Sequence, residues 1–166
     1  MFILLLLALV GCDDLLSPDK NKLRDEFVAA AKTYIGTAYR LGEESREATD
    51  CSGLIYAVCK DIGHPIHRIS ARRLAETYKT VEGEHGDLPT FSHNGATIAH
   101  IGIWADDTRL EMVHASSSKG VIQSEVNQYY WKPRLMDTVK CPAIADLETM
   151  ILARQMYILN AMDEDK

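Results

Sequence analysis

Apolar residues recur at helical spacing, every three or four positions, in four parts of the chain. This spacing places them on one face of a helix and predicts amphipathic helices that pack against a core. The first two of these patterns end at Gly36 and Gly63, and glycine commonly follows the last turn of a helix. The sequence therefore predicts helices over 23–34, 51–62, 70–78 and 142–162.

Polar and apolar residues alternate in the second half of the chain, a pattern that predicts strands with one buried face. Residues 98–105, 109–115 and 120–126 are three such runs, and residues 106–108 form a turn between the first two. Short connections of this kind predict a small antiparallel meander. Residues 82–94, which are rich in glycine, histidine and aspartate, predict a surface loop instead. The fold class is therefore expected to be α+β.

The start of the second helix carries the strongest candidate for chemistry, Cys51, with Asp50 or Thr49 as the expected N-cap. Unpaired backbone N–H groups and the positive end of the helix dipole favour a thiolate at this position. A cysteine so placed is a better nucleophile than one in mid-helix. Cys59, two turns farther along the same helix, lacks that advantage.

His100 and His114 lie on two strands that are expected to pair. A three-residue loop over 106–108 would place them directly opposite each other, with Cβ atoms roughly 4.5–5.5 Å apart. This arrangement fits a nucleophile, a base and an orienting group. Cys51 would attack a carbonyl carbon, with its own backbone N–H as an oxyanion donor. His100 would pair with the thiolate and later protonate the leaving amine, and His114 would fix the tautomer of His100.

Length, charge and cysteine content narrow the possible partners. The 166 residues are enough for one domain with a buried core and too few for two ordinary ones. A net charge of −6, with no basic cluster longer than Arg72-Arg73, argues against a nucleic-acid partner. A partial zinc site from Cys59, His64 and His67 would need a fourth ligand from elsewhere, so neither a metal nor a cofactor is expected.

Residues 1–10 are almost purely aliphatic, and the run is too short to span a bilayer as a helix. It has the length of a signal-peptide hydrophobic region. Residues 9–12 resemble the bacterial lipobox, which predicts removal of residues 1–11 and a lipid on Cys12 that anchors an extracytoplasmic protein to a membrane. An ordinary signal peptide or a misplaced start codon is the alternative. The polar residues 12–21 then predict a tether.

Seven short motifs follow one another along the chain. They are Tyr39-Arg40-Leu41-Gly42, Asp50-Cys51-Ser52-Gly53, Gly86-Asp87-Leu88, His100-Ile101-Gly102-Ile103-Trp104, Val113-His114-Ala115-Ser116, Gly120-Val121-Ile122 and Tyr130-Trp131. In their order and approximate spacing they resemble the motifs of the NlpC-type cell-wall endopeptidases, which are papain-like cysteine peptidases. The resemblance covers about residues 25–135.

The resemblance implies a minimal papain-like fold, in which the nucleophile helix packs on a small antiparallel sheet. The helix predicted after Pro142 is an addition outside the family core. The chain is therefore expected to divide into four parts: a lipoprotein signal peptide (1–11), a lipidated cysteine with its tether (12–21), a catalytic domain (22–140) and a C-terminal helical extension (141–166).

The resemblance also implies the chemistry. The family hydrolyses the bond between γ-D-glutamate and a diamino acid in peptidoglycan stem peptides. Its nucleophile and two histidines correspond to Cys51, His100 and His114, and the tyrosine that assists its oxyanion hole corresponds to Tyr39. The positions that correspond to substrate-binding residues are Asp50, Ser52, Arg68 and Ser70. The segment 65–70 departs from the usual Leu-Pro-Arg-Ser/Thr pattern, which leaves the subsite preference open.

Two other functions stay open from the sequence. An amidase or acyltransferase can use the same scaffold, because a thioester intermediate can be resolved by water or by another nucleophile. A lipoprotein that only binds the cell wall or a partner could carry the same three residues without using them. The sequence does not indicate an oligomeric state.

Overall fold

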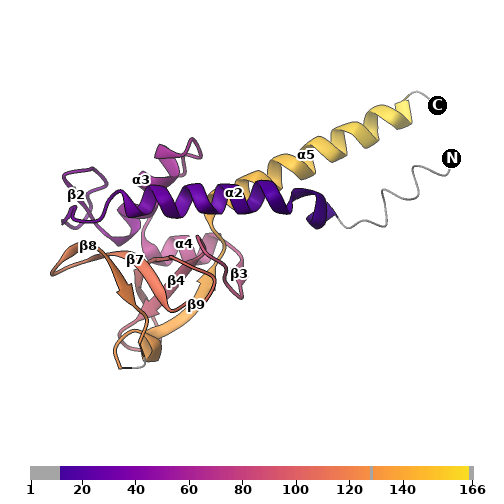
Figure 1. Cartoon of the computed structure of the whole chain (residues 1–166). Coiled ribbons are helices and arrows are strands. Elements are labelled where there is room, and N and C mark those ends of the chain that lie inside the picture. The colour runs from indigo at the N-terminus through magenta and orange to yellow at the C-terminus, as the bar shows by residue number, and fades with distance from the viewer. Residues whose placement is uncertain (1–11, 128, 165–166) are drawn as a thin grey trace.

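Helices cover one side of small β-sheets in the computed structural model, which describes residues 12–127 and 129–164 (Figure 1). The helices are α2 (Cys12–Lys32), α3 (Cys51–Asp61), α4 (Ala71–Thr77), α5 (Pro142–Glu164) and a short 3-10 helix, η1 (Lys132–Arg134). Helices α2 and α5 lie side by side and project beyond the sheets, and an ion pair between Lys20 and Glu148 joins them. All four helices predicted from the apolar spacing are confirmed.

The strands of the described residues form three sheets. The first pairs β1 (Ala38–Tyr39) with β2 (Ala48–Thr49), the second has the order β3 (Thr80–Val81), β9 (Leu135–Val139), β4 (Leu88–Ser92) and β5 (Ile98–Ile101), and the third has the order β6 (Ile103–Trp104), β7 (Glu111–Ser116) and β8 (Gly120–Glu125). The α+β class and the antiparallel meander, here β6–β7–β8, are confirmed.

The nucleophile helix is held by the main hydrophobic core. Leu54 and Ile55 of α3 are fully buried, and they belong to one cluster with Phe27 of α2, Ile101 of β5 and Val113 of β7. Each such side chain contributes about 1.5–3 kcal/mol on burial, so α3 is fixed firmly between α2 and the strands. This packing sets where the first residue of α3, Cys51, meets the histidine-bearing strands.

The strands differ from the sequence-based expectation in several places. The predicted loop 82–94 contains β4, every residue of which is buried, and β9 was not predicted. The sequence of β4, Leu-Pro-Thr-Phe-Ser, shows neither a polar alternation nor a continuous apolar run, so neither strand pattern marks it. The predicted strand 98–105 is divided at Gly102 into β5 and β6, which belong to different sheets. A Cβ at Gly102 would lie 2.8 Å from the Met112 sulfur and 3.3 Å from the Val113 backbone oxygen, so a side chain would crowd β7 at this crossing.

The expected tether at 12–21 is also wrong, because α2 begins at Cys12 and continues through it. A run of polar residues does not distinguish a tether from a solvent-facing helix. Residues 1–11, for which a signal peptide is expected, lie outside the described part of the chain. Within 12–127 and 129–164, no helix combines the length and the apolar character needed to cross a bilayer.

Candidate active site

Cys51 is the first residue of α3, and Asp50 is its N-cap. Asp50 Oδ1 accepts a hydrogen bond of 2.7 Å from the backbone N–H of Gly53, which satisfies one of the unpaired donors at the helix start. A side chain at Gly53 would collide with the backbone oxygen of Glu43, 2.1 Å from the position of its Cβ. The local structure therefore accounts for both Asp50 and Gly53, and the segment between them places Cys51 at the start of the helix.

Three of the four predicted substrate-binding residues form one hydrogen-bonded network beside Cys51. Arg68 donates from Nη2 to Asp50 Oδ2 (2.7 Å) and from Nη1 to Ser52 Oγ (2.8 Å), and Ser52 donates to Asp50 Oδ1 (3.0 Å). Burial opposes ionisation of Asp50, but hydrogen bonds from Gly53, Gly42 and Ser52, together with the Arg68 charge, outweigh it and hold the Asp50 pKa below its usual value. This network braces the start of α3.

Ser70 does not join that network. Its hydroxyl caps α4 by accepting the backbone N–H of Arg73 at 3.3 Å, and the residue is exposed. None of Asp50, Ser52, Arg68 and Ser70 lines the cleft that contains Cys51. Each of these four residues therefore makes a hydrogen bond within the protein, and its role in substrate binding stays a prediction.

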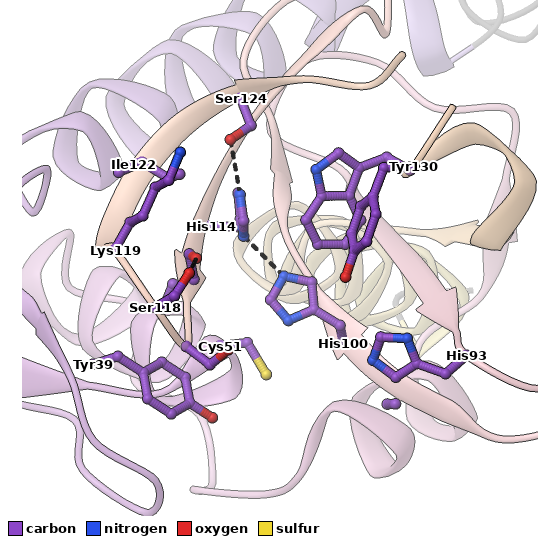
Figure 2. A pocket seen from close by; sticks show the side chains of 15 residues that line it. Tyr39, Cys51, His93, His100, His114, Ser118, Lys119, Ile122, Ser124 and Tyr130 are labelled. Atoms are coloured by element: carbon purple, nitrogen blue, oxygen red, sulfur yellow. Dashed lines mark hydrogen bonds between the residues drawn. The ribbon is translucent and has the colours of Figure 1, made fainter. Parts of the chain in front are cut away.

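A cleft of about 570 Å³ opens over Cys51 (Figure 2). It is walled on one side by Tyr39 and the β7–β8 turn and on the other by His93 and Tyr130. Its lining residues are Tyr39, Cys51, His93, Ala99, His100, His114, Ala115, Ser116, Ser117, Ser118, Lys119, Ile122, Ser124, Tyr130 and Trp131. All four predicted catalytic residues, Cys51, His100, His114 and Tyr39, are therefore brought together in one place.

The two histidines meet, but not as the predicted cross-strand pair. The hairpin pairs Ile103 with Val113 and Trp104 with Met112, so its loop is longer than three residues and the predicted register is wrong. His100 lies on β5, which belongs to the other sheet and pairs with β4. The contact is made across the junction of the two sheets, where His100 Nε2 lies 2.9 Å from His114 Nδ1.

The orientation of His100 suits a base for Cys51. Its Nε2 is engaged with His114, and Figure 2 shows its other ring nitrogen on the side of the Cys51 sulfur. The Trp131 ring stacks on His100, with centroids 5.1 Å apart and an interplanar angle of 24°, and meets His114 edge-on at 4.9 Å. Trp131 therefore holds both imidazoles and shields them from water, a role that the sequence pattern did not indicate.

The ionisation of the site differs from the prediction of a thiolate at the helix start. Burial, reinforced by the Asp50 carboxylate, raises the pKa of the Cys51 thiol to about 11, although backbone N–H groups of Ile101, Ser52 and Cys51 itself act in the opposite direction. Burial also lowers the pKa of His100 to about 3 and that of His114 to about 4. Desolvation opposes the helix dipole here and favours the neutral forms of the thiol and of both imidazoles.

Two further polar groups complete the site. Figure 2 shows the Tyr39 ring beside Cys51 with its hydroxyl directed toward the cleft. Burial and the neighbouring Cys51 and Asp50 raise the pKa of Tyr39, so its hydroxyl stays a hydrogen-bond donor. Ser124 of β8, which the sequence analysis missed, has its Oγ 3.0 Å from His114 Nε2. In the sequence, the only indication of this contact is that Ser124 lies on a predicted strand next to the strand that carries His114.

The alternative metal site receives no support. Cys59 is fully buried in the hydrophobic core, and no group of three or more histidine, cysteine or acidic residues within 12–127 and 129–164 is arranged to hold a metal ion. Cys141 is buried as well, which raises its pKa to about 12. Cys12 begins α2, but its side chain lies outside the described part of the structure, so its lipidation stays a prediction.

Comparison with known proteins agrees with this geometry. The profile of the NlpC/P60 family matches residues 36–140. Over 137 residues the chain is 31% identical to the probable endopeptidase NlpC of Escherichia coli K12, covering 76% of this chain and 88% of that protein. It is 34% identical over 119 residues to the murein DD-endopeptidase MepS/murein LD-carboxypeptidase of the same strain, covering 69% of this chain and 59% of the relative.

Solved structures show the same fold. The NlpC/P60 domain of the peptidoglycan hydrolase SagA superposes with a TM-score of 0.58 at 23% identity, over 70% of this chain and 97% of that domain. An NLP/P60-family protein similar to lipoproteins, from Staphylococcus aureus Mu50, superposes with a TM-score of 0.61 at 24% identity, over 72% of this chain and 41% of that protein. The papain-like arrangement of helix and sheet expected from the motifs is therefore confirmed.

Proposed function

Because the chain belongs to the NlpC/P60 family of cell-wall endopeptidases, we propose that it is a cysteine peptidase that hydrolyses peptidoglycan stem peptides. The bond between γ-D-glutamate and the diamino acid is its proposed target. The observation that carries the proposal is the convergence of Cys51, His100 and His114 in one open cleft, with His100 bonded to His114 at 2.9 Å.

The reaction begins from the neutral pair. As the Cys51 sulfur attacks the scissile carbonyl carbon, its proton passes to the free ring nitrogen of His100, so no isolated charge is formed in the buried site. The carbonyl oxygen becomes an oxyanion, to which the backbone N–H of Cys51 and the Tyr39 hydroxyl are directed as donors. His114 accepts from His100 Nε2–H and stabilises the imidazolium.

The tetrahedral intermediate then collapses by breaking its carbon–nitrogen bond. His100 returns its proton to the leaving amine, and an acyl thioester remains on Cys51. A water molecule, deprotonated by the same nitrogen of His100, attacks the thioester and releases the carboxylic acid and the thiol. Atoms and protons balance, and every group used belongs to the chain or to water.

A second bond deserves the same test. The relative MepS is named a murein DD-endopeptidase and a murein LD-carboxypeptidase, so a D,D or L,D peptide bond of the cell wall is the second candidate target. Incubation of the purified protein with defined muropeptides, followed by mass spectrometry, separates the possibilities. New termini between glutamate and the diamino acid are the expected result, whereas new termini at a D,D or L,D bond would favour the second candidate. An acyl product joined to an added amine would favour an acyltransferase, and no cleavage at all would contradict a peptidase.

We further propose that Cys12 carries a lipid that anchors the protein on the extracytoplasmic side of a membrane. The support is the aliphatic run that ends in Leu9-Val10-Gly11-Cys12. In a bacterial host fed a labelled fatty acid, the wild-type protein should take up the label and sediment with membranes, and C12A should do neither. Labelling of C12A to the wild-type level would contradict the anchor without affecting the proposed hydrolysis.

A further inference from the structure

We propose that Ser124 is a positioning residue of this site, because its hydroxyl accepts the Nε2–H of His114 and so sets which nitrogen of each histidine carries a proton. Ser124 lies in the same cleft, and its expected effect on turnover rests on the proposed function. The proposed role of Ser124 begins before turnover, because the hydroxyl also sets the tautomers of the resting protein.

The side chains of Ser124, His114 and His100 form a continuous series of hydrogen bonds that ends at His100, beside the nucleophile. Ser124 Oγ lies 3.0 Å from His114 Nε2, and His114 Nδ1 lies 2.9 Å from His100 Nε2 (Figure 2). A neutral imidazole has one N–H donor and one bare acceptor nitrogen. If His114 donates to Ser124, its Nδ1 is bare and must accept from His100. The remaining nitrogen of His100 is then bare as well, and it faces the Cys51 sulfur.

If each hydrogen bond of the series had its donor and acceptor exchanged, His100 could not act as a base. A Ser124 hydroxyl that donated to His114 Nε2 would place protons on His114 Nδ1 and on the His100 nitrogen that faces Cys51. The first direction, with His114 donating to Ser124, is favoured in the resting site, because the bare nitrogen of His100 can then accept the S–H of the Cys51 thiol. It is favoured further once Cys51 gives up its proton, because the positive charge that forms on the histidines is stabilised by an acceptor oxygen at the far end. Ser124 therefore acts through His114 and His100 and does not touch the reacting atoms.

The position of Ser124 is set by the sheet. Ser124 is paired with Met112 in the ladder between β8 and β7, two residues from His114 on the latter strand. The start of β8 is held as well, since Gly120 packs on Thr37 so closely that an added Cβ would lie 2.3 Å from the Thr37 oxygen. A residue on a paired strand is placed more accurately than one on a loop. Among the described residues, Ser124 is the hydrogen-bond partner of His114 Nε2.

A matched pair of variants tests the hydroxyl alone. S124T keeps the hydroxyl and adds a methyl group, whereas S124V has the shape of threonine without the hydroxyl, and both suit a strand. We expect S124V to lower kcat on a stem peptide about five- to tenfold with little change in KM, the effect of one lost hydrogen bond. S124T should stay within about twofold of the wild-type protein on the same measure.

Two readouts do not depend on the substrate. Nitrogen-15 and carbon-13 NMR of the histidine rings should show the Nε2–H tautomer of His114 in the wild-type protein and in S124T, and a mixture in S124V. The rate at which iodoacetamide alkylates Cys51 at pH 7 should fall in S124V alone. Equal alkylation rates and the same His114 tautomer in S124T and S124V would overturn the proposal. A wild-type protein that cleaves no stem peptide, but shows these differences, would contradict the proposed substrate and leave Ser124 in its role.

Discussion

Replacement of Cys51 by alanine should lower the cleavage of stem peptides by at least about 10⁴-fold, because Cys51 is the only cysteine among the described residues that line the cleft and the thiol that faces His100. H100A should cost roughly 10²–10⁴-fold, the usual contribution of a positioned general base and acid. Both rates are measured by chromatography of muropeptide digests at a fixed enzyme concentration. Cleavage by C51A at the wild-type rate would remove the cysteine-peptidase assignment.

Cys59 offers the matched control for C51A. It lies on the same helix but is fully buried in the core, away from the cleft. C59A should therefore cleave at close to the wild-type rate, with any loss confined to thermal stability. A loss of activity in C59A as large as that in C51A would show that the cysteine substitutions act through the fold and not through chemistry.

The pH dependence of the same reaction follows from the buried histidine. The pKa of His100 is lowered to about 3, so lowering the pH from 7 to 5 does not protonate the base. Activity should hold over that interval and fall only as the pH approaches the pKa of His100. An ordinary exposed histidine would lose its base function near its unperturbed pKa of about 6.5. On the alkaline side, activity should fall as the pH approaches the raised pKa of the Cys51 thiol, because loss of that proton leaves His100 with none to give to the leaving amine.

Much of this site could be predicted from local sequence, because Cys51 lies at a helix start. A helix start is encoded by neighbouring residues, so the cap by Asp50 and the position of Cys51 followed from a few letters of sequence. The thiolate did not follow, because the ionisation of Cys51 depends on how much protein covers it. Burial is a property of the assembled core, which the helix-start pattern does not contain.

The histidines show the complementary case. The contact between His100 and His114 was predicted, but from a hairpin register that the structure does not have. Strand β5 ends before Gly102, and β6, which follows Gly102, belongs to the other sheet. The pair is instead set by packing between sheets, together with the ring of Trp131, which comes from the distant segment before η1. Contacts between residues far apart in sequence leave no periodic signal, so neither Trp131 nor Ser124 could be assigned its role from the pattern.

The largest effect on stability is expected from a residue outside the cleft, Arg24 of α2. Its side chain is only 5% exposed, and Nη1 lies 2.9 Å from Oδ1 of Asp87, whose side chain is 1% exposed. The same carboxylate accepts the backbone N–H groups of Cys141 and Glu84, at 2.8 and 3.0 Å. Asp87 thus ties α2 to the segments that precede β4 and α5, and it depends on Arg24 for a counter-charge.

R24M keeps most of the apolar stem and removes the charge, which leaves Asp87 buried without its cation. Breaking a buried pair in this way costs about 3–5 kcal/mol, and we expect urea unfolding of R24M to show a loss of that order. R72M is the control, because Arg72 and its partner Glu76 are 66% and 42% exposed, and such a pair contributes roughly 0.3–0.5 kcal/mol. Since Arg24 does not line the cleft, R24M should keep its activity at a temperature where it is folded. Equal unfolding midpoints for R24M and R72M would show that the Arg24–Asp87 pair does not hold α2 to the sheets.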